Sequence, residues 1–150
     1  MRLRRASLAD MPVVAALHRT TLRVSLPFLP ELHTAEDDRR FFSGAFFEAN
    51  RIWIAEDETG LAGYAAIAAG WLNHLYIHPD RQGQGLGGLL LAKAMEEEGE
   101  LQLWAFQKNT RARAIYEAKG FVLVRLTDGA DNEEREPDAL YRWTRPVTDD

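Results

Sequence analysis

The chain has 150 residues, 46% of them hydrophobic, a formal net charge of −5 and no cysteine. The missing cysteine excludes disulfides, thiolate metal sites and a covalent cysteine mechanism, and the acidic charge disfavours nucleic acid as the main partner. Length and apolar content predict a single domain over residues 1–150, and without a long apolar run we expect a soluble, cytoplasmic protein with no membrane partner.

The N-terminal third is expected to hold one strand and two helices. Residues 2–6 alternate as an edge strand would, and Ser7 with Asp10 has the spacing of a capping box at the start of a helix. A second helix is predicted over residues 34–47, with Thr34 as its N-cap.

Three antiparallel strands are expected next. Residues 51–56 form the first strand, residues 57–60 a hairpin turn, and residues 61–69 the returning strand. Gly70 then turns the chain into the third strand, residues 71–77.

The remaining elements alternate between helix and strand. We expect a helix over residues 86–98, a strand over residues 101–106, a helix capped by Asn109, a buried strand over residues 121–124 and a closing strand over residues 139–144. This order predicts an α+β fold around a mixed sheet.

The segment between the last two strands is strongly acidic. Residues 128–138 hold six acids and only Arg135 to balance them. The favoured interpretation is a solvated loop, as charge runs usually are. The alternative is that Asp128, Glu133 or Glu134 faces a cationic acceptor.

Residues 75–90 pass from an apolar strand, through Pro79 and four glycines, into a leucine-rich helix. Glycines let the backbone approach a ligand closely, and the first turn of a helix leaves N–H groups unpaired at the positive end of its dipole. The pattern therefore predicts an anion site, and phosphate fits it best.

Three phosphate-binding patterns compete for this loop. A P-loop needs Lys and then Ser/Thr where this chain has Leu89-Leu90. The dinucleotide pattern G-x-G-x-x-G fits the glycines, but residues 79–82 separate them from the strand, and the next strand ends in Gln107-Lys108 instead of an acid. The third pattern, Gln82-x-x-Gly85-x-Gly87, resembles the pyrophosphate loop of the GNAT N-acetyltransferases.

A second motif follows in the order found in the same superfamily. The segment Asn109-x-x-Ala112-x-x-x-Tyr116-Glu117-x-x-Gly120-Phe121 resembles its N-x-x-A-x-x-x-Y-E-x-x-G-F segment. The resemblance runs from about residue 51 to residue 143 and, more loosely, over the N-terminal third.

The resemblance implies both a fold and a reaction. The GNAT fold is a central mixed, mostly antiparallel sheet of six to seven strands flanked by about four helices, with a splay that falls here between residues 71–77 and 101–106. The implied reaction transfers acetyl from acetyl-CoA, as co-substrate, to a primary amine by direct attack in a ternary complex, with no metal. The acceptor would be a small-molecule, peptide or protein amine, in a pocket walled by the two N-terminal helices. A homodimer through the C-terminal strands is compatible with the resemblance.

Carried over residue by residue, the resemblance also gives a site. Backbone groups of the glycine loop would hold the pyrophosphate, the edge of the preceding strand would pair with the pantetheine arm, and the N–H of Ile77 would donate to the thioester carbonyl. Tyr116 would act as general acid, because its reference pKa of about 10 lies near the value of about 8.5 for a thiol. The expected cofactor-binding residues are Leu75, Tyr76, Ile77, Gln82, Gly83, Gln84, Gly85, Leu86, Gly87, Gly88, Asn109 and Tyr116.

The general base is not apparent in the sequence. On a regular strand, the inward positions before the loop hold Trp71 and Asn73, while His74 and His78 point to the other face. Three routes stay open: a water positioned by Asn73, a carboxylate from residues 128–134, or His33.

A second function class also stays open. An acyl-CoA-binding sensor or partner-docking module of the same fold would need no base, and the missing base on the strand favours it. The presence of Tyr116 favours the enzyme, because a pure binding module has no need of a placed acid. The sequence leaves the identity of the acceptor open.

Overall fold

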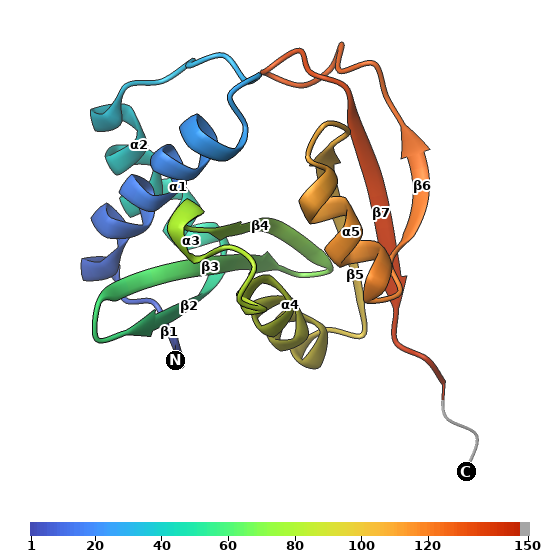
Figure 1. The fold of residues 1–150 in the computed structure, drawn as a ribbon, viewed down its shortest axis with the longest axis horizontal. Coiled ribbons are helices and arrows are strands. Elements are labelled where there is room, and N and C mark those ends of the chain that lie inside the picture. Colours follow the sequence, from blue (N-terminus) through green and yellow to red (C-terminus); the bar gives the residue numbers. More distant parts are fainter. Residues whose placement is uncertain (148–150) are drawn as a thin grey trace.

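The computed structural model describes residues 1–147, which form a seven-stranded sheet in the order β1-β2-β3-β4-β5-β7-β6 (Figure 1). Neighbouring strands are antiparallel except for β4 and β5, which are parallel. The strands are β1 (Arg2–Arg5), β2 (Arg51–Asp57), β3 (Gly60–Ala68), β4 (Trp71–Ile77), β5 (Glu100–Phe106), β6 (Val122–Leu126) and β7 (Asp138–Thr144). The expected α+β fold with a mixed, mostly antiparallel sheet is confirmed.

Helices cover both faces of this sheet. They are α1 (Met11–Ser25), α2 (Ala35–Phe41), α3 (Phe47–Ala49), α4 (Leu86–Glu97) and α5 (Thr110–Ala118). One core cluster joins α4, through Leu90 and Leu91, to β5 and β7. A second cluster joins α1, through Val14, to Phe42 and to Tyr64 of β3. The sheet therefore separates an α1/α2 side from an α4/α5 side (Figure 1).

The helix predicted over residues 34–47 is present as a helical segment that runs to Ala49 but is interrupted in the middle. Thr34 is its N-cap, as expected, and accepts a hydrogen bond from the N–H of Asp37 at 3.1 Å. The α-helical geometry then gives way to a π-type segment, Phe42–Phe46, in which Gly44 has φ −113° and ψ −107°. This wider turn accompanies the burial of both Phe42 and Phe46 against the core.

The strand expected over residues 121–124 is present as β6, but the expectation that it is buried is wrong. Strand β7 lies between β5 and β6, so β6 becomes the edge of the sheet and all of its residues are exposed. Val122 and Val124 keep 66% and 56% of their surface accessible. The buried side chain is Phe121, which stacks on Trp143 just before the strand begins.

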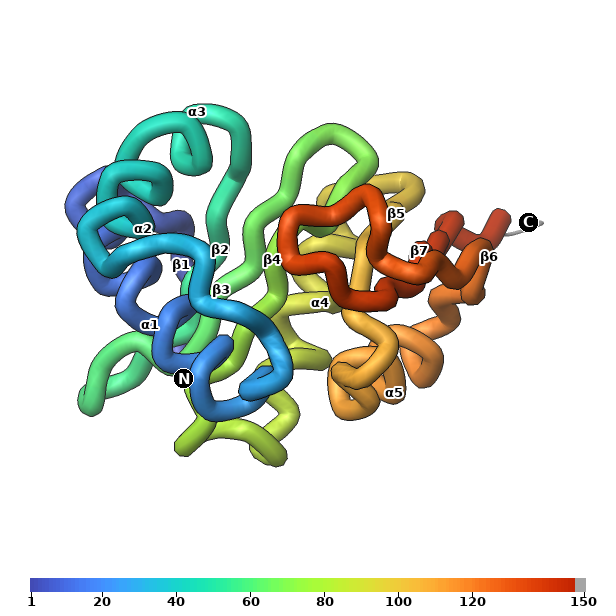
Figure 2. The backbone as a smooth tube through the Cα atoms, turned by 90° about the horizontal axis from the view of Figure 1, so that it is seen from above, coloured from blue at the N-terminus to red at the C-terminus, as the bar shows by residue number. Residues whose placement is uncertain are grey.

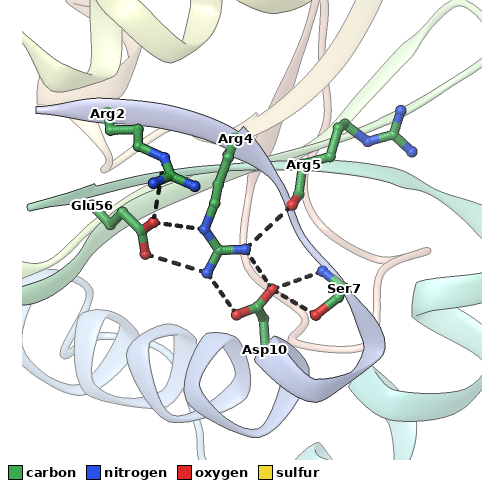
Figure 3. Close-up of polar contacts among 6 residues, drawn as sticks. All are labelled: Arg2, Arg4, Arg5, Ser7, Asp10 and Glu56. Carbon is green, nitrogen blue, oxygen red and sulfur yellow. Dashed lines mark hydrogen bonds and ion pairs between the residues drawn. The ribbon is translucent and has the colours of Figure 1, made fainter.

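The chain start is held to the sheet by a cluster around Arg4 (Figure 3). Its Nε donates to Glu56 on β2 at 2.6 Å, and its Nη2 donates to Asp10 at 2.8 Å. Asp10 also accepts from the backbone N–H of Ser7 at 2.7 Å, which confirms the expected capping box. The hydrogen bonds from Arg4 hold the pKa of Asp10 well below its usual range.

Strands β4 and β5 touch at one end only. Their ladder consists of the single pair Trp71 and Gln102, after which the two strands diverge. The splay implied by the resemblance is therefore present, and it leaves the C-terminal half of β4 without a ladder partner on that side.

Candidate active site

The glycine loop connects β4 to α4 as the sequence predicts. Gly83 and Gly85 adopt φ of 80° and 81°, in the left-handed region that favours glycine, and Gly85 is the N-cap of α4. The N–H groups of Leu86, Gly87 and Gly88 belong to the first turn, where they have no partner within the helix. The backbone here presents a row of donors at the positive end of a helix.

Two cations flank this row, Arg111 on α5 and Lys119 at the C-cap of that helix, and sequence reasoning missed both. A Cβ atom at Gly83 would lie 4.0 Å from Nη1 of Arg111, and one at Gly88 would lie 3.9 Å from Nζ of Lys119. Neither cation forms an ion pair within residues 1–147. The sequence did contain a signal for them. Arg111 and Lys119 are eight residues apart, so on a helix their side chains point in similar directions.

The free edge of β4 faces the splay. The N–H of His78 donates to the carbonyl of Ala62 on β3 at 2.8 Å. Hydrogen-bonded pairs alternate along an antiparallel ladder, so Leu75 and Ile77, which pair with Ala65 and Gly63, direct their backbone groups away from β3. Their N–H and C=O groups therefore face β5, where no ladder partner stands.

The side chain of Gln82 is directed back toward α1. Its Nε2 donates to Oγ of Ser25 at 2.9 Å and to the carbonyl of Ile77 at 3.2 Å, and Thr21 also donates to that carbonyl at 3.4 Å. These contacts attach the end of α1 to the end of β4. They hold the peptide between Ile77 and His78, which directly follows the free N–H of Ile77.

Tyr116 lies on α5 and is 5% exposed. Its ring packs against Phe121 and Tyr141 at centroid distances of 5.8 and 6.2 Å. Burial raises the pKa of Tyr116 well above its ordinary value, and the neighbouring Tyr76 adds to the shift. Its hydroxyl is therefore protonated at any working pH. Asn109 caps α5, accepting from the N–H of Ala112 at 3.3 Å.

A cavity of about 1100 Å³ opens on the α1/α2 side. It is bounded by α1, α2, the segment joining them, β4, β5 and the β6–β7 loop. Tyr76 lines it from β4 and Ala105 with Phe106 from β5, so both edges of the splay reach the cavity. Its carboxylates are Glu31, Asp37, Asp38, Asp128, Asp131, Glu133, Glu134 and Asp138.

Part of this negative charge is compensated. Arg19 pairs with Asp38 at 3.2 Å and Arg23 with Glu31 at 2.6 Å, which leaves the carboxylates of the β6–β7 loop as the main excess. The loop is solvated, as expected, since Asp128, Asp131 and Glu133 are exposed, and it also borders the cavity. Glu134 lines the same cavity as Tyr76, and burial together with this carboxylate raises the pKa of Tyr76 to about 12.

The β6–β7 loop also closes against the α1–α2 connection. His33 Nε2 lies 2.6 Å from Oε1 of Glu133. The two segments meet at the top of Figure 1 and lie side by side when viewed from above in Figure 2. His33, the third expected route for a base, is thus part of the cavity wall.

The expectation that His74 points away from the site is wrong. The pairing of β3 with β4 slips between Ala66 and Ile67, whose partners are His74 and Leu72, so Asn73 is an extra residue in a bulge. His74 pairs in regular register and shares the face of Tyr76, so it points into the cavity, and Asn73 in the bulge also lines it. His78 caps the next turn instead, accepting from the N–H of Asp80.

His18 on α1 is a cavity residue that sequence reasoning missed. Its ring stacks on His74 with centroids 5.0 Å apart and an interplanar angle of 13°. Burial lowers the pKa of His18 to about 4 and holds the pKa of His74 well below its usual value. Both imidazoles are therefore neutral near pH 7. A single histidine within a predicted helix does not indicate, from sequence alone, that its side chain lines a cavity.

Comparison with known proteins fits this geometry. The family model described as the acetyltransferase (GNAT) domain matches residues 48–123, which is half of the chain. The chain belongs to the GNAT acetyltransferase family. It is thus an acyltransferase, and the match spans the glycine loop, β5, α5 and the free edge of β4.

Relatives of this GNAT chain are acetyltransferases. It is 24% identical over 123 residues to the peptidyl-lysine N-acetyltransferase YiaC of Escherichia coli, covering 81% of this chain and 84% of that one. It is 29% identical over 141 residues to the probable N-acetyltransferase Rv2775 of Mycobacterium tuberculosis, covering 81% and 79%. The fold matches yncA of Salmonella typhimurium, solved with its cofactor acetyl-CoA, at a TM-score of 0.74 and 15% identity over 100% of this chain and 96% of that one.

Two further findings concern residues 1–147 of this GNAT chain. Within that range no helix combines the length and the apolar character needed to cross a membrane. In the same range no three His, Asp or Glu side chains are grouped so that they could hold a metal ion.

Proposed function

We propose that this enzyme transfers acetyl from acetyl-CoA to a primary amine that carries positive charge, by direct attack in a ternary complex. One observation carries the proposal: the unpaired edge of β4 lies between a row of anion-binding N–H groups and an acidic cavity, and both edges of the splay reach that cavity. The acetyl group and the amine can meet there without an intermediate on the protein.

The residues present suit a coenzyme A molecule. N–H groups of residues 84–88 can bind the pyrophosphate, and Arg111 and Lys119 bring positive charge beside them. The pantetheine arm is peptide-like, so it can pair with Leu75 and Ile77 as an added strand would. Bound acetyl-CoA supplies the thioester that reacts.

The N–H of Ile77 is the proposed donor to the thioester carbonyl as negative charge develops on its oxygen. The adjoining peptide, between Ile77 and His78, is held by the contacts of Thr21 and Gln82 to the Ile77 carbonyl and by the His78 N–H, which donates to Ala62. A donor that is already oriented stabilises the transition state without reorganisation, and removing one such donor typically costs about 10²–10³ in kcat.

Tyr116 is the proposed general acid for the departing thiolate. Burial keeps it protonated, so the proton is in place when the sulfur leaves. The same burial makes full transfer to a thiolate of pKa about 8.5 more uphill than the reference values suggest. The hydroxyl therefore first stabilises the sulfur by donating a hydrogen bond, and transfer completes as charge builds on it.

The amine must lose a proton before it attacks, and the bulge supplies a position for that step. Nδ2 of Asn73 donates to Oδ1 of Asn50 at 2.9 Å, which leaves Oδ1 of Asn73 free to accept from a water or from the amine. Glu134 lines the same cavity and can receive the proton through that water. The proposal thus combines two of the three expected routes, the water positioned by Asn73 and a carboxylate from residues 128–134.

The acidic cavity also favours a cationic acceptor, because it concentrates positive charge near β4. Relatives include a peptidyl-lysine N-acetyltransferase. A lysine side chain in a peptide is therefore the first acceptor to test, beside polyamines and amino sugars.

The test is calorimetric titration with acetyl-CoA and CoA, followed by thiol release against this panel of amines. We expect micromolar binding and amine-dependent release. Binding without release for any amine would contradict the proposed reaction and favour an acyl-CoA sensor. No binding would contradict the assignment of the glycine loop.

A further inference from the structure

His74 and Tyr64 form a hydrogen-bonded pair inside the acceptor side of the molecule. The Tyr64 hydroxyl lies 2.9 Å from Nδ1 of His74. The pair sits among the rings of Phe42, Phe46 and Tyr76, each with its centroid within 6.5 Å of one member of the pair. Tyr64 is 0% exposed, whereas His74 also lines the cavity.

Counting protons in this pair determines which nitrogen of His74 carries hydrogen. The Tyr64 hydroxyl has one hydrogen to donate, it is shielded from water, and Nδ1 of His74 is its hydrogen-bond partner among residues 1–147. If Nδ1 carried a proton, the two groups would both be donors, and the Tyr64 hydrogen would be buried without an acceptor. The satisfied arrangement has the hydroxyl donating to a bare Nδ1. The neutral ring then carries its hydrogen on Nε2.

The surroundings do not favour the doubly protonated ring. His18 stacks on His74 from α1, and Tyr64 and Tyr76 face it from β3 and β4. Asp38 on α2 is a nearby carboxylate, and its charge acts on His18 and Tyr64. Phe42 and Phe46 supply no charge. A proton on His74 would lack a partner at Nδ1 and would face a second imidazole.

We propose that Tyr64 fixes His74 as its Nε2–H tautomer, so that His74 donates a hydrogen bond to an oxygen atom of the acceptor and does not serve as the general base. The two ring nitrogens point in diverging directions, so the Nε2–H is directed away from Tyr64 and is the polar edge that His74 presents to the cavity. A neutral imidazole in this tautomer has no free lone pair for the amine proton.

This inference rests on the proposed function and narrows its substrate class. An acceptor with a carbonyl or hydroxyl oxygen near the reacting amine, such as a lysine peptide or an amino sugar, can receive the hydrogen bond from His74. A polyamine has no oxygen and cannot. The acidic carboxylates select for charge, and His74 selects for the oxygen.

The tautomer is tested directly by long-range proton–nitrogen correlation NMR on the full chain labelled with nitrogen-15 in histidine. The His74 signals are assigned by their loss in His74→Gln. We expect the Nε2–H pattern from pH 6 to pH 8. An Nδ1–H pattern, or an imidazolium pattern at pH 6.5 and above, would overturn the proposal. The NMR experiment does not require catalysis, so it can test the tautomer even if the proposed acetyl transfer is not observed.

Kinetics test the donor role with two matched variants. His74→Gln retains an N–H group at the reach of Nε2 but has no basic nitrogen, whereas His74→Leu retains neither. Both variants remove Nδ1, which accepts the hydrogen bond from Tyr64, so the effect of losing that bond is the same in the two variants. With a lysine peptide we expect kcat/KM of His74→Gln to exceed that of His74→Leu by about 10-fold, the worth of one hydrogen bond. With a polyamine we expect no difference.

Two kinetic results would overturn the proposal. One is equal kcat/KM for the two variants with the lysine peptide. The other is a loss of 100-fold or more in His74→Gln together with disappearance of an acid limb from its pH–rate profile, because that result would identify His74 as the base. Circular dichroism of each variant checks that the fold is intact.

Discussion

The two sides of β4 are built from different parts of the chain. On the cofactor side, the groups that face the ligand are mostly backbone: the N–H groups of the glycine loop and the free edge at Leu75 and Ile77. On the acceptor side they are side chains brought together from α1, α2, β4 and the β6–β7 loop. In the proposed function, backbone groups recognise what all CoA thioesters share, and the side chains determine which acceptor binds. Substitutions should therefore separate into two classes with different kinetic signatures.

Replacing Tyr116, the proposed general acid, should have the largest effect. We expect Tyr116→Phe to lower kcat by about 10²-fold while acetyl-CoA affinity changes little, because only the departing thiolate needs the hydroxyl. The control is Tyr141→Phe, a buried neighbour 6.2 Å away whose hydroxyl bonds to Arg113 and Glu117. Stopped-flow thiol release measures both. Unchanged kcat in Tyr116→Phe would remove Tyr116 from the mechanism.

A glycine pair tests whether the cofactor side depends on backbone. Gly85 and Gly70 have φ of 81° and 77°, and an added Cβ meets nothing within 4 Å at either position. Alanine at each should therefore destabilise the fold similarly, by about 1 kcal/mol. Only Gly85→Ala should also weaken acetyl-CoA binding, by roughly 10-fold, because it disturbs the donors of the first turn of α4. Equal affinities in calorimetry would contradict the phosphate role of the loop.

On the acceptor side, Glu134→Gln should raise KM for a cationic amine by about 3- to 10-fold and leave acetyl-CoA affinity unchanged. It should also lower kcat if the amine proton passes to this carboxylate. Glu58→Gln, in the exposed hairpin turn between β2 and β3, removes the same charge far from the cavity and is the control. A matching KM in the two variants would show that the acidic loop plays no part in acceptor binding.

The smallest effect is expected at the Arg4 cluster, which belongs to neither side. Arg4→Gln should lower Tm by about 2–4 °C, since partly exposed ion pairs contribute little each. Arg2→Gln is the control, because its side chain is 73% exposed and lies 3.9 Å from Glu56. The pKa of Asp10 is lowered in the folded state, so its contribution is present at neutral pH and is lost as pH falls below the usual carboxylate range. Thermal unfolding of the wild type and the two variants at pH 7 and in acid measures the change in Tm and its dependence on pH.

The geometry of the glycine loop could be predicted from the sequence because it is local. Residues 82–88 form one continuous loop, and Asn109 and Tyr116 follow at fixed spacing on one helix, so no long-range pairing has to be known. The left-handed glycines and the start of α4 at Leu86 follow from the same short stretch.

The acceptor side could not be predicted because it depends on tertiary pairing. Which face of β4 borders the cavity depends on how the helices pack on the sheet, and the bulge at Asn73 is set by the register of β4 against β3. The insertion of β7 beside β5 exposes β6 and carries the acidic loop over the cavity. His18 becomes a cavity residue only when α1 packs on β4.

The central claim, that an acidic cavity selects a cationic amine for acetyl transfer at the β4 edge, is tested most directly by one kinetic comparison. Two lysine peptides of equal length, one with a second lysine and one with a glutamate near the reacting residue, are supplied with acetyl-CoA at low and high salt. We predict higher kcat/KM for the cationic peptide at low salt, with the difference shrinking as salt screens the carboxylates. Equal rates, or a preference for the acidic peptide, would contradict the account.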